Sequence, residues 1–512
     1  MLELAGEPQR LRQWWDKIVE LGPKYGYFPN ATKSYLIVKP EKRNKANKIF
    51  RDTNIIICQT GKRYLGGALG CDEFTRDYLG EKVKKWLGEL DRLAKFASSE
   101  PHAAFAALTH GLIGRWLYAI RVSEASADDL FRPLEVAIRQ KIIPALTGQP
   151  APNDDVRKML ALPARLGGLG ILDPTAITAI EREASEECSA PLVDIILESK
   201  QSCGRQRIEN TLQALEKQKA VKRRNKRKRQ EAQKKEAESI IASLPAMQRD
   251  CALVAQEKGV SSWVTAIPVD RAGFSLHKSA FRDALALRYN WPLHQLPRKC
   301  TCGEAFTVDH ALICRHGGFQ IQRHNRLRDL IAALLQEVCA NVSTEPLLQP
   351  ITGESLGPSA NKDDNARLDV CAGGFGGIEQ QDAFFDVRVF YPFASSYRQS
   401  KLSSVYRQHE NKKRREYGQR VREIERGSFT PLVFTTEGGM AGETTVFIKR
   451  LASMMSQKRS ESYSCVLGWI RCTVSFCLLR SSLMCLRGTR TKQPKIDCDA
   501  IAEAVAASRI DH

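Results

Sequence analysis

The chain has 512 residues, with 78 Lys plus Arg against 58 Asp plus Glu and a formal net charge of +20. A chain of this length rarely folds around a single hydrophobic core, so several domains are expected. The positive excess favours a polyanionic partner, with nucleic acid ahead of an anionic membrane.

The 15 cysteines are an odd number scattered along the chain. This usage favours free thiols in a reducing compartment, with a metal ion binding a few of them. The first residues lack the basic-then-apolar order of a signal peptide. Arg471 and Arg480 interrupt the apolar C-terminal stretch and leave only residues 472–479 uncharged. We therefore expect no membrane span and no membrane partner.

Residues 1–72 contain strand-like segments at 34–39 and 55–58, followed by a turn at 63–67. They resemble the end of a reverse-transcriptase palm from a non-LTR retrotransposon. Lys33 matches the lysine of the fourth polymerase motif, and Tyr64-Leu-Gly66 matches the primer-grip turn. In that family the metal-binding Asp-Asp hairpin lies before the point where this chain begins. The resemblance therefore implies a nucleic-acid-binding Lys33 but no polymerase centre.

Residues 73–204 predict a helical region. Apolar residues recur three and four apart from Phe74 to about Val122, and further helices are expected at 130–145 and 155–162. This region resembles the thumb of the same family. The Asp-Asp pairs at 128–129 and 154–155 do not lie between apolar strands, so we do not expect them to replace the missing polymerase centre.

Residues 205–245 form a basic arm, predicted to be helical or disordered, and a linker region at 246–299 follows. The cations of its central run are Lys222, Arg223, Arg224, Lys226, Arg227, Lys228 and Arg229. Such a run is commonly a solvated helix or a disordered stretch. It is also typical of a nuclear-import signal or of an arm that binds phosphates, and these readings do not exclude one another.

A metal-binding pattern occupies residues 300–317. Cys300, Cys302, His310 and Cys314 can supply four tetrahedral ligands, and Zn²⁺ prefers such nitrogen and sulfur donors. The single residue between the first two cysteines is a tighter spacing than usual, and His316 is an alternative to His310. We expect a structural CCHC zinc knuckle, because all four positions are filled by protein.

Residues 318–456 predict an α/β domain, and residues 457–512 a C-terminal tail. The expected elements are a helix at 327–338, strands near 346–348, Asp369 and Asp386, a basic helix at about 405–425 and a strand at 431–435. This αβββαβ order resembles the restriction-like PD-(D/E)XK endonuclease fold. The expected fold is therefore multidomain: a mainly α thumb and linker region, a small knuckle and an endonuclease domain.

The strand around Asp386 carries the expected chemistry. Alternation places Phe384, Asp386, Arg388 and Phe390 on one face and leaves the other face wholly apolar. A Gly-rich turn at 373–377 joins this strand to Asp369, so a hairpin can bring the two carboxylates together. Mg²⁺ prefers oxygen ligands, and a carboxylate pair beside a cation suits phosphodiester hydrolysis. A surface ion pair is the alternative.

Together, these features resemble the polyproteins of site-specific, early-branching non-LTR retrotransposons over residues 10–488. The resemblance implies that Asp369 and Asp386 hold Mg²⁺. It also implies that Lys413 or Arg388 stabilises charge and that Tyr417 positions them. The sequence departs from the family at Leu368, where a Pro is usual, and at Arg388, where the general fold has a Lys. Asp382 is an alternative to Asp386.

The expected function is Mg²⁺-dependent nicking of a DNA target in the nucleus. The 3′-hydroxyl so formed would prime reverse transcription of the element's RNA. One rival is a protein whose nuclease has decayed, so that it only binds DNA or RNA. A second rival is a ribonuclease that uses the same residues. The sequence determines neither the target site nor the number of strands cut, nor the oligomeric state.

Overall fold

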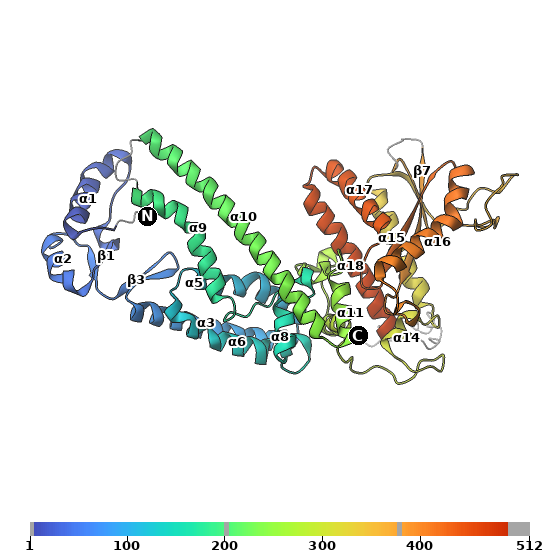
Figure 1. The fold of residues 1–512 in the computed structure, drawn as a ribbon, viewed down its shortest axis with the longest axis horizontal. Coiled ribbons are helices and arrows are strands. Elements are labelled where there is room, and N and C mark those ends of the chain that lie inside the picture. The colour runs from blue at the N-terminus through green and yellow to red at the C-terminus, as the bar shows by residue number, and fades with distance from the viewer. Residues whose placement is uncertain (1–4, 199–203, 376–380, 490–512) are drawn as a thin grey trace, which may run out of the picture. The chain divides into compact units, whose positions relative to one another are not determined.

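The computed structural model describes residues 5–198, 204–375 and 381–489 (Figure 1). These residues are mostly helical, with a mixed four-stranded sheet in the C-terminal half. The chain divides into two compact units. The N-terminal unit comprises residues 1–162 and 170–240, and the C-terminal unit comprises 163–169 and 241–512.

The N-terminal unit is built largely of helices. They are α1 (Pro8–Leu21), α2 (Arg43–Ile49), α3 (Asp72–Ala97), α4 (Pro101–Ala106), α5 (Ile113–Arg121), α6 (Arg132–Ala137), α7 (Ile143–Thr147), α8 (Asp154–Ala161), α9 (Thr178–Glu198) and α10 (Gly204–Ser243). Its strands are β1 (Tyr35–Ile37), parallel to β2 (Ile56–Cys58), and β3 (Gly61–Tyr64), antiparallel to β4 (Gly67–Gly70).

The helices expected between residues 73 and 162 are present, and their apolar stripe is core. Trp86 and Trp116 are buried, with ring centroids 6.3 Å apart in an edge-to-face contact. Asn153 begins α8, and its side chain accepts a hydrogen bond of 2.9 Å from the Val156 N–H. Asp154 therefore belongs to a helix start, which agrees with its exclusion as a polymerase ligand.

The C-terminal unit contains the sheet. Its elements are α11 (Ala246–Ala255), α12 (Ser262–Thr265), α13 (Lys278–Tyr289), α14 (Val308–Ile313), α15 (Phe319–Gln336), β5 (Ala340–Thr344), β6 (Val370–Gly373), β7 (Asp382–Phe390), α16 (Leu402–Glu423), β8 (Ser428–Thr435), α17 (Gly442–Arg459) and α18 (Tyr463–Arg487). From α15 to β8 the order is αβββαβ, as expected from the sequence.

The position predicted for the first strand is wrong. Strand β5 covers Ala340–Thr344, whereas Leu347 forms only an isolated bridge with Arg367. Pro346 has no N–H, so it interrupts a continuous ladder at the predicted position. Residues 376 and 377 of the Gly-rich turn expected at 373–377 lie outside the described residues.

The sheet has the order β5-β6-β7-β8, in which only β7 and β8 run parallel. Helices α15, α17 and α18 cover one face, and α16 covers the other (Figure 1). The predicted alternation along β7 is confirmed. Phe385 and Val387 enter the larger core, while Phe384 and Phe390 pack toward α16.

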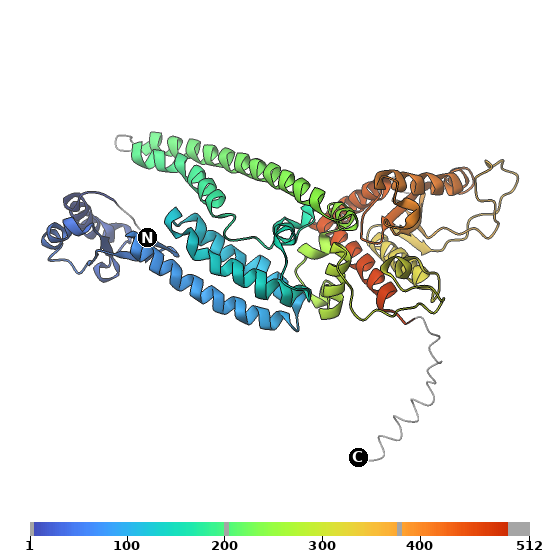
Figure 2. The same ribbon diagram turned by 60° about the horizontal axis from the view of Figure 1, so that its bottom comes forward.

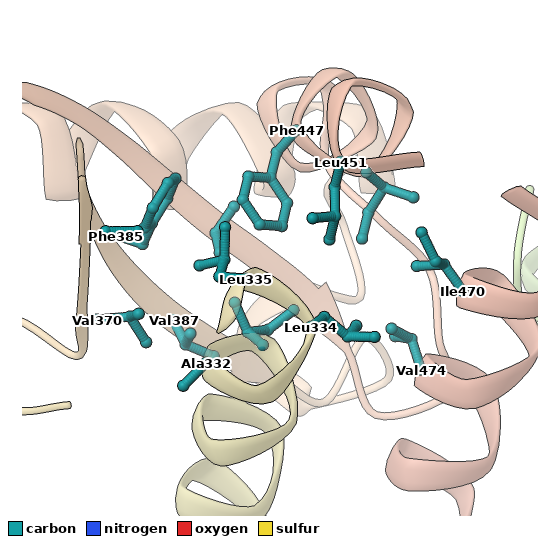
Figure 3. Packing of buried hydrophobic residues seen from close by; sticks show 14 of the residues in the cluster. Ala332, Leu334, Leu335, Val370, Phe385, Val387, Phe447, Leu451, Ile470 and Val474 are labelled. Carbon is teal, nitrogen blue, oxygen red and sulfur yellow. The ribbon is translucent and has the colours of Figure 1, made fainter. Parts of the chain in front are cut away.

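The larger core joins three helices to the sheet. Figure 3 shows Leu334 and Leu335 of α15, Phe385 of β7, Phe447 of α17 and Val474 of α18 meeting in this cluster. The Phe385 and Phe447 rings lie 5.0 Å apart. Helix α18 is therefore part of the core, and the prediction of a C-terminal tail at 457–512 is wrong for this helix. Residues 490–512 of the predicted tail lie outside the described residues.

Helix α18 also passes a test for membrane spans by length and composition. Its most apolar window of 18 residues has a mean hydropathy of 1.3, so the expectation that charges leave no such run is wrong by this measure. However, 67% of that window is buried inside the protein. A core helix meets the same criterion, and Ile470 and Val474 lie in the sheet's core.

Candidate functional site

The two predicted catalytic aspartates are neighbours across β6 and β7. The register pairs Val370 with Phe385, so the next pair is Asp369 with Asp386. The Asp369 N–H donates to the Phe385 carbonyl at 3.2 Å. The Asp369 Oδ2 in turn accepts a 2.6 Å hydrogen bond from the Val387 N–H. Asp369 directly precedes β6, and its carboxylate extends the hydrogen bonding to β7 by one residue. This fixes its position beside Asp386.

Both aspartates open into one cavity of about 400 Å³. It is lined by Gln320, Ile321, Arg323, His324, Arg367, Asp369, Asp386, Val387, Arg388, Val389, Lys413 and Tyr417. The five residues that the retrotransposon resemblance implied as catalytic are all among them. Asp382 is not, because it pairs with Gly373 at the other end of β6. The geometry favours Asp386 over that alternative.

Asp386 is 6% exposed and faces the ammonium group of Lys413. The Lys413 Nζ lies 3.2 Å from Oδ1 and 3.1 Å from Oδ2 of Asp386. Among the described residues no group donates a well-directed hydrogen bond to Oδ2. Burial raises the pKa of Asp386 to about 6; Lys413 lowers this pKa, and Asp369 raises it.

Helix α16 supplies three polar residues to one side of β7. His409, Lys413 and Tyr417 are spaced four apart, as expected for a shared face. The His409 ring lies 4.6 Å from the Phe390 ring and accepts or donates a 3.1 Å hydrogen bond with the Tyr397 hydroxyl. Burial lowers the pKa of His409 to about 4, so this residue is a neutral packing partner.

Tyr417 and Arg388 occupy different depths of the cavity. Tyr417 is buried, and its hydroxyl accepts a 3.3 Å hydrogen bond from Asn361 Nδ2. Lys413 Nζ lies 5.3 Å from the centre of the Tyr417 ring. Arg388 is exposed on β7. Tyr417 therefore supports Lys413 from inside, whereas Arg388 is available at the rim.

His324 is a cavity residue that sequence analysis missed. Its Nε2 lies within 2.8 Å of Asp369 Oδ1, and it shares a face of α15 with Gln320, four residues earlier. The apolar periodicity identified the buried side of α15 but not which polar residues face Asp369. The only signal in the sequence was a histidine in the first turns of this helix. Its position in the sequence does not show which distant residue it contacts.

The predicted zinc ligands converge. The Sγ atoms of Cys300 and Cys314 lie 3.9 Å apart, Cys302 Sγ lies 3.3 Å from His310 Nε2, and all four ligand atoms lie within 4.8 Å of one another. A tetrahedron with Zn–S bonds of about 2.3 Å has edges of roughly 3.8 Å. The cluster could therefore hold a metal ion such as zinc.

Local structure explains the convergence. A tight turn at Cys300-Thr-Cys-Gly303 is closed by a 2.9 Å hydrogen bond from the Gly303 N–H to the Cys300 carbonyl, and Gly303 has φ +99°. His310 lies in α14, and Cys314 follows its end, so both point from one side of a helical turn. Burial raises the pKa of Cys300, but hydrogen bonds with Cys302 and His310 lower it more, to about 6.

The segment that carries the Cys/His cluster is joined to the sheet. The Tyr391 hydroxyl, directly after β7, donates a 2.7 Å hydrogen bond to Asp309 Oδ1 of α14. Leu312, Phe319, Tyr391 and Cys485 form a small buried cluster. The possible metal site and the aspartate cavity therefore belong to one packed unit.

The predicted basic arm is part of the 40-residue helix α10, which runs beside α9 (Figure 2). Two of its seven predicted cations pair with α9. Arg224 lies 3.2 Å from Glu187, and Arg229 bonds with the buried Glu181. Five others are exposed: Lys222, Arg223, Lys226, Arg227 and Lys228. The run is thus a helix in which two cations hold the hairpin and five face solvent.

Lys33 lies in a different element, at the end of a short 3-10 helix (Ala31–Lys33) before β1. Its N–H donates a 3.2 Å hydrogen bond to the Asn30 side chain, while its own side chain is exposed. Its contact with nucleic acid stays a prediction.

No protein-family model matches the chain, and a search of curated proteins finds no match.

Proposed function

We propose that this chain is a retrotransposon-derived, nucleic-acid-binding protein whose C-terminal unit nicks a DNA target with Mg²⁺. The observation that carries the proposal is the meeting of Asp369, Asp386 and Lys413 in one cavity. We assign the C-terminal sheet to a restriction-like, PD-(D/E)XK-like endonuclease because of its αβββαβ order. The order and the paired carboxylates are independent observations.

The residues in the cavity suit a hard divalent cation. Asp369 and Asp386 offer carboxylate oxygens, the donors that Mg²⁺ prefers, and the buried Asp386 Oδ2 lacks a directed hydrogen bond within the described part of the chain. Asp369 is held in place by His324 and by the Val387 N–H. Bound Mg²⁺ would supply a polarised water and neutralise charge on the phosphate.

The protein's own residues would act on the phosphodiester as follows. The Lys413 ammonium, 3.1 Å from Asp386 in this structure, would steady negative charge that develops on the phosphate oxygens. Arg388 at the rim would hold the entering phosphate by charge-assisted hydrogen bonds. Tyr417, with its hydroxyl fixed by Asn361, would keep the lysine in position.

The remaining basic and metal-binding parts fit a nucleic-acid partner. The five exposed cations of α10 can contact phosphates without reading sequence. A zinc knuckle fixed to the sheet would add a rigid surface near the proposed active site. In the proposed cycle the nick provides the 3′-hydroxyl that primes copying of the element's RNA by a polymerase centre outside this chain. The basic run would also serve as the nuclear-import signal.

A second candidate is a protein that binds DNA or RNA without cutting it. One observation favours it: Lys413 already neutralises Asp386, and among the described residues the only group of three or more metal-ligating side chains is the Cys/His cluster. In this alternative the aspartate cavity is an ion-pair site that holds α16 against β7.

Nicking of supercoiled plasmid by the purified chain with Mg²⁺ at low salt distinguishes the two candidates. We expect relaxed circles with the wild type and none with Asp386→Asn. Asp382→Asn is a matched control, because it changes a carboxylate of the same strand outside the cavity. Absence of nicking by a folded wild-type protein that still binds DNA would favour the binding-only protein. Preferential cutting of a matched RNA duplex would instead indicate a ribonuclease.

A further inference from the structure

A well-fixed loop, residues 349–363, packs against α16. The guanidinium of Arg420 is fully buried, and it donates three hydrogen bonds to carbonyls of this loop. Their lengths are 3.2 Å to Asn361, 2.7 Å to Asp363 and 3.0 Å to Gln349. Because a buried guanidinium must satisfy its donors, this arrangement fixes the loop to the helix.

The loop also reaches the catalytic cavity. The Gly357 N–H donates to Gln419 Oε1 at 2.8 Å, and the Asn361 N–H donates to the Glu416 carbonyl at 2.8 Å. The Asn361 side chain donates to the Tyr417 hydroxyl, and Tyr417 lines the cavity of the two aspartates. The loop and helix therefore form two walls that begin at the proposed active site.

Two further cavities lie between these walls. One, of about 470 Å³, is lined by Ser359, Ala360, Asn361, Lys412, Arg415 and Glu416. The next, of about 520 Å³, shares Ser359, Ala360 and Arg415 with it and extends to Arg422. From residue 413 to residue 422 the helix rises roughly 13 Å. We call this succession of cavities the α16 channel.

The charge of the α16 channel is positive. Lys412 and Arg415 are exposed, and neither has a carboxylate partner within the described part of the chain. Arg422 pairs with the adjacent Glu423, at 3.5 Å, and remains largely in solvent. The acidic residue of the channel, Glu416, lies 3.7 Å from Lys413 and is offset by it. Unpaired cations along a fixed groove are suited to a polyanion.

We propose that the α16 channel binds the backbone phosphates of the DNA strand that flank the one at Asp369 and Asp386, with Lys412, Arg415 and Arg422 as the contacting cations. This proposal rests on the proposed function. A strand of B-DNA carries one phosphate per 3.4 Å of helix axis, so a rise of about 13 Å spans about four of them. The channel thereby fixes which way the strand leaves the active site.

The test is the salt dependence of binding, measured by fluorescence anisotropy on a labelled DNA duplex without added Mg²⁺. Each lost phosphate contact reduces the slope of log K against log salt by about 0.9. We expect the Lys412→Ala/Arg415→Ala variant to lose about 1.8 from the slope. The matched control, Lys401→Ala/Arg407→Ala, removes two exposed cations of the same helix region outside the channel and should lose less. Equal slopes for the two double variants would overturn the proposal.

A second variant approaches the channel from its other wall. Ser359→Asp places a carboxylate on the loop without changing α16, and it should weaken DNA binding in the same salt-sensitive way. Unchanged affinity in this variant, with an unchanged melting temperature, would also contradict the channel. Both experiments measure binding. If the wild type binds DNA normally but never nicks plasmid, the nuclease proposal is rejected, whereas the channel can still be tested. If the wild type nicks plasmid but the salt slope of the Lys412→Ala/Arg415→Ala variant is unchanged, only the channel proposal is rejected.

Discussion

At the scale of single residues, the environment of Asp386 decides its protonation. Burial disfavours the charged carboxylate and raises its pKa from 3.8 to about 6, against the opposing effect of Lys413. In the unfolded chain an aspartate has a pKa near 3.9. Between these two values the folded protein binds the extra proton, so the free energy of unfolding should fall as pH rises from about 4 to about 6.

This titration gives the first prediction. The decrease in the free energy of unfolding that comes from Asp386 amounts to about 2–3 kcal/mol for a pKa shift of this size, and the Asp386→Asn variant should not show it. Urea unfolding of wild type and variant at several pH values between 4 and 7 measures the difference. The Asp382→Asn control should follow the wild type, because the exposed Asp382 lies outside the cavity. A constant difference between Asp386→Asn and wild type across this range would contradict the assignment.

The metal cluster gives a second prediction. Zinc analysis of the purified protein should find one ion per chain, and His310→Ala should remove it because only three of the four tetrahedral ligands remain. His310→Cys keeps four ligands and should retain the metal. Cys465→Ser is the control, since this exposed cysteine belongs to α18 and not to the cluster. Full zinc content in His310→Ala would show that His310 is not an essential ligand.

At the scale of elements, α10 separates two functions within one basic run. Arg224 and Arg229 pair with acidic residues of α9, so they stabilise the helical hairpin. Arg121 also pairs with the buried Glu181, at 2.7 Å, so two guanidinium groups surround this one carboxylate. The five exposed cations form no salt bridge to α9 within the described part of the chain, and they are the ones that can reach phosphates.

The third prediction separates the two groups. Changing the five exposed cations, Lys222, Arg223, Lys226, Arg227 and Lys228, to Gln should reduce the salt slope of DNA binding by about 4.5 and leave the melting temperature unchanged. Arg224→Gln/Arg229→Gln should do the reverse, lowering thermal stability because Glu181 loses a partner in a buried position. Similar salt slopes in the two variants would contradict this division.

At the scale of the whole molecule, the C-terminal unit is a single body that includes its last helix. The core cluster contains side chains of α15, β7, α17 and α18, and the knuckle packs against Tyr391 and Cys485. The metal cluster, the aspartate cavity and α18 therefore share one hydrophobic framework. A change in the interior of α18 should be felt throughout that framework.

The fourth prediction concerns α18. Ile470→Ala should cost about 2–5 kcal/mol of stability, because it leaves a cavity in the core beneath the sheet. Cys465→Ala, at an exposed position of the same helix, should change stability little. The apolar length of α18 also suits a bilayer, so flotation with zwitterionic liposomes, which do not attract a chain of net charge +20, is the decisive check. Since its apolar side chains are already buried, we expect the intact protein not to float through this helix.

The sequence by itself determined the features that depend on short-range spacing. Four ligands within 15 residues specified the Cys/His cluster, and strict alternation placed Asp386 and Arg388 on the face of β7 toward α16. Spacing of four put Lys413 and Tyr417 on one side of α16. Such patterns follow from the geometry of a single turn, helix or strand. This geometry is the same wherever the element lies in the fold.

Only the tertiary structure decided the features that depend on how distant elements meet. The register of β6 on β7 placed Asp369 opposite Asp386 and excluded Asp382, and packing of α15 brought His324 to Asp369. Burial of Arg420 fixed a loop some 60 residues earlier in the chain, and core packing enclosed a helix as apolar as a membrane span. These contacts depend on the register and packing of the entire core, which no local period encodes.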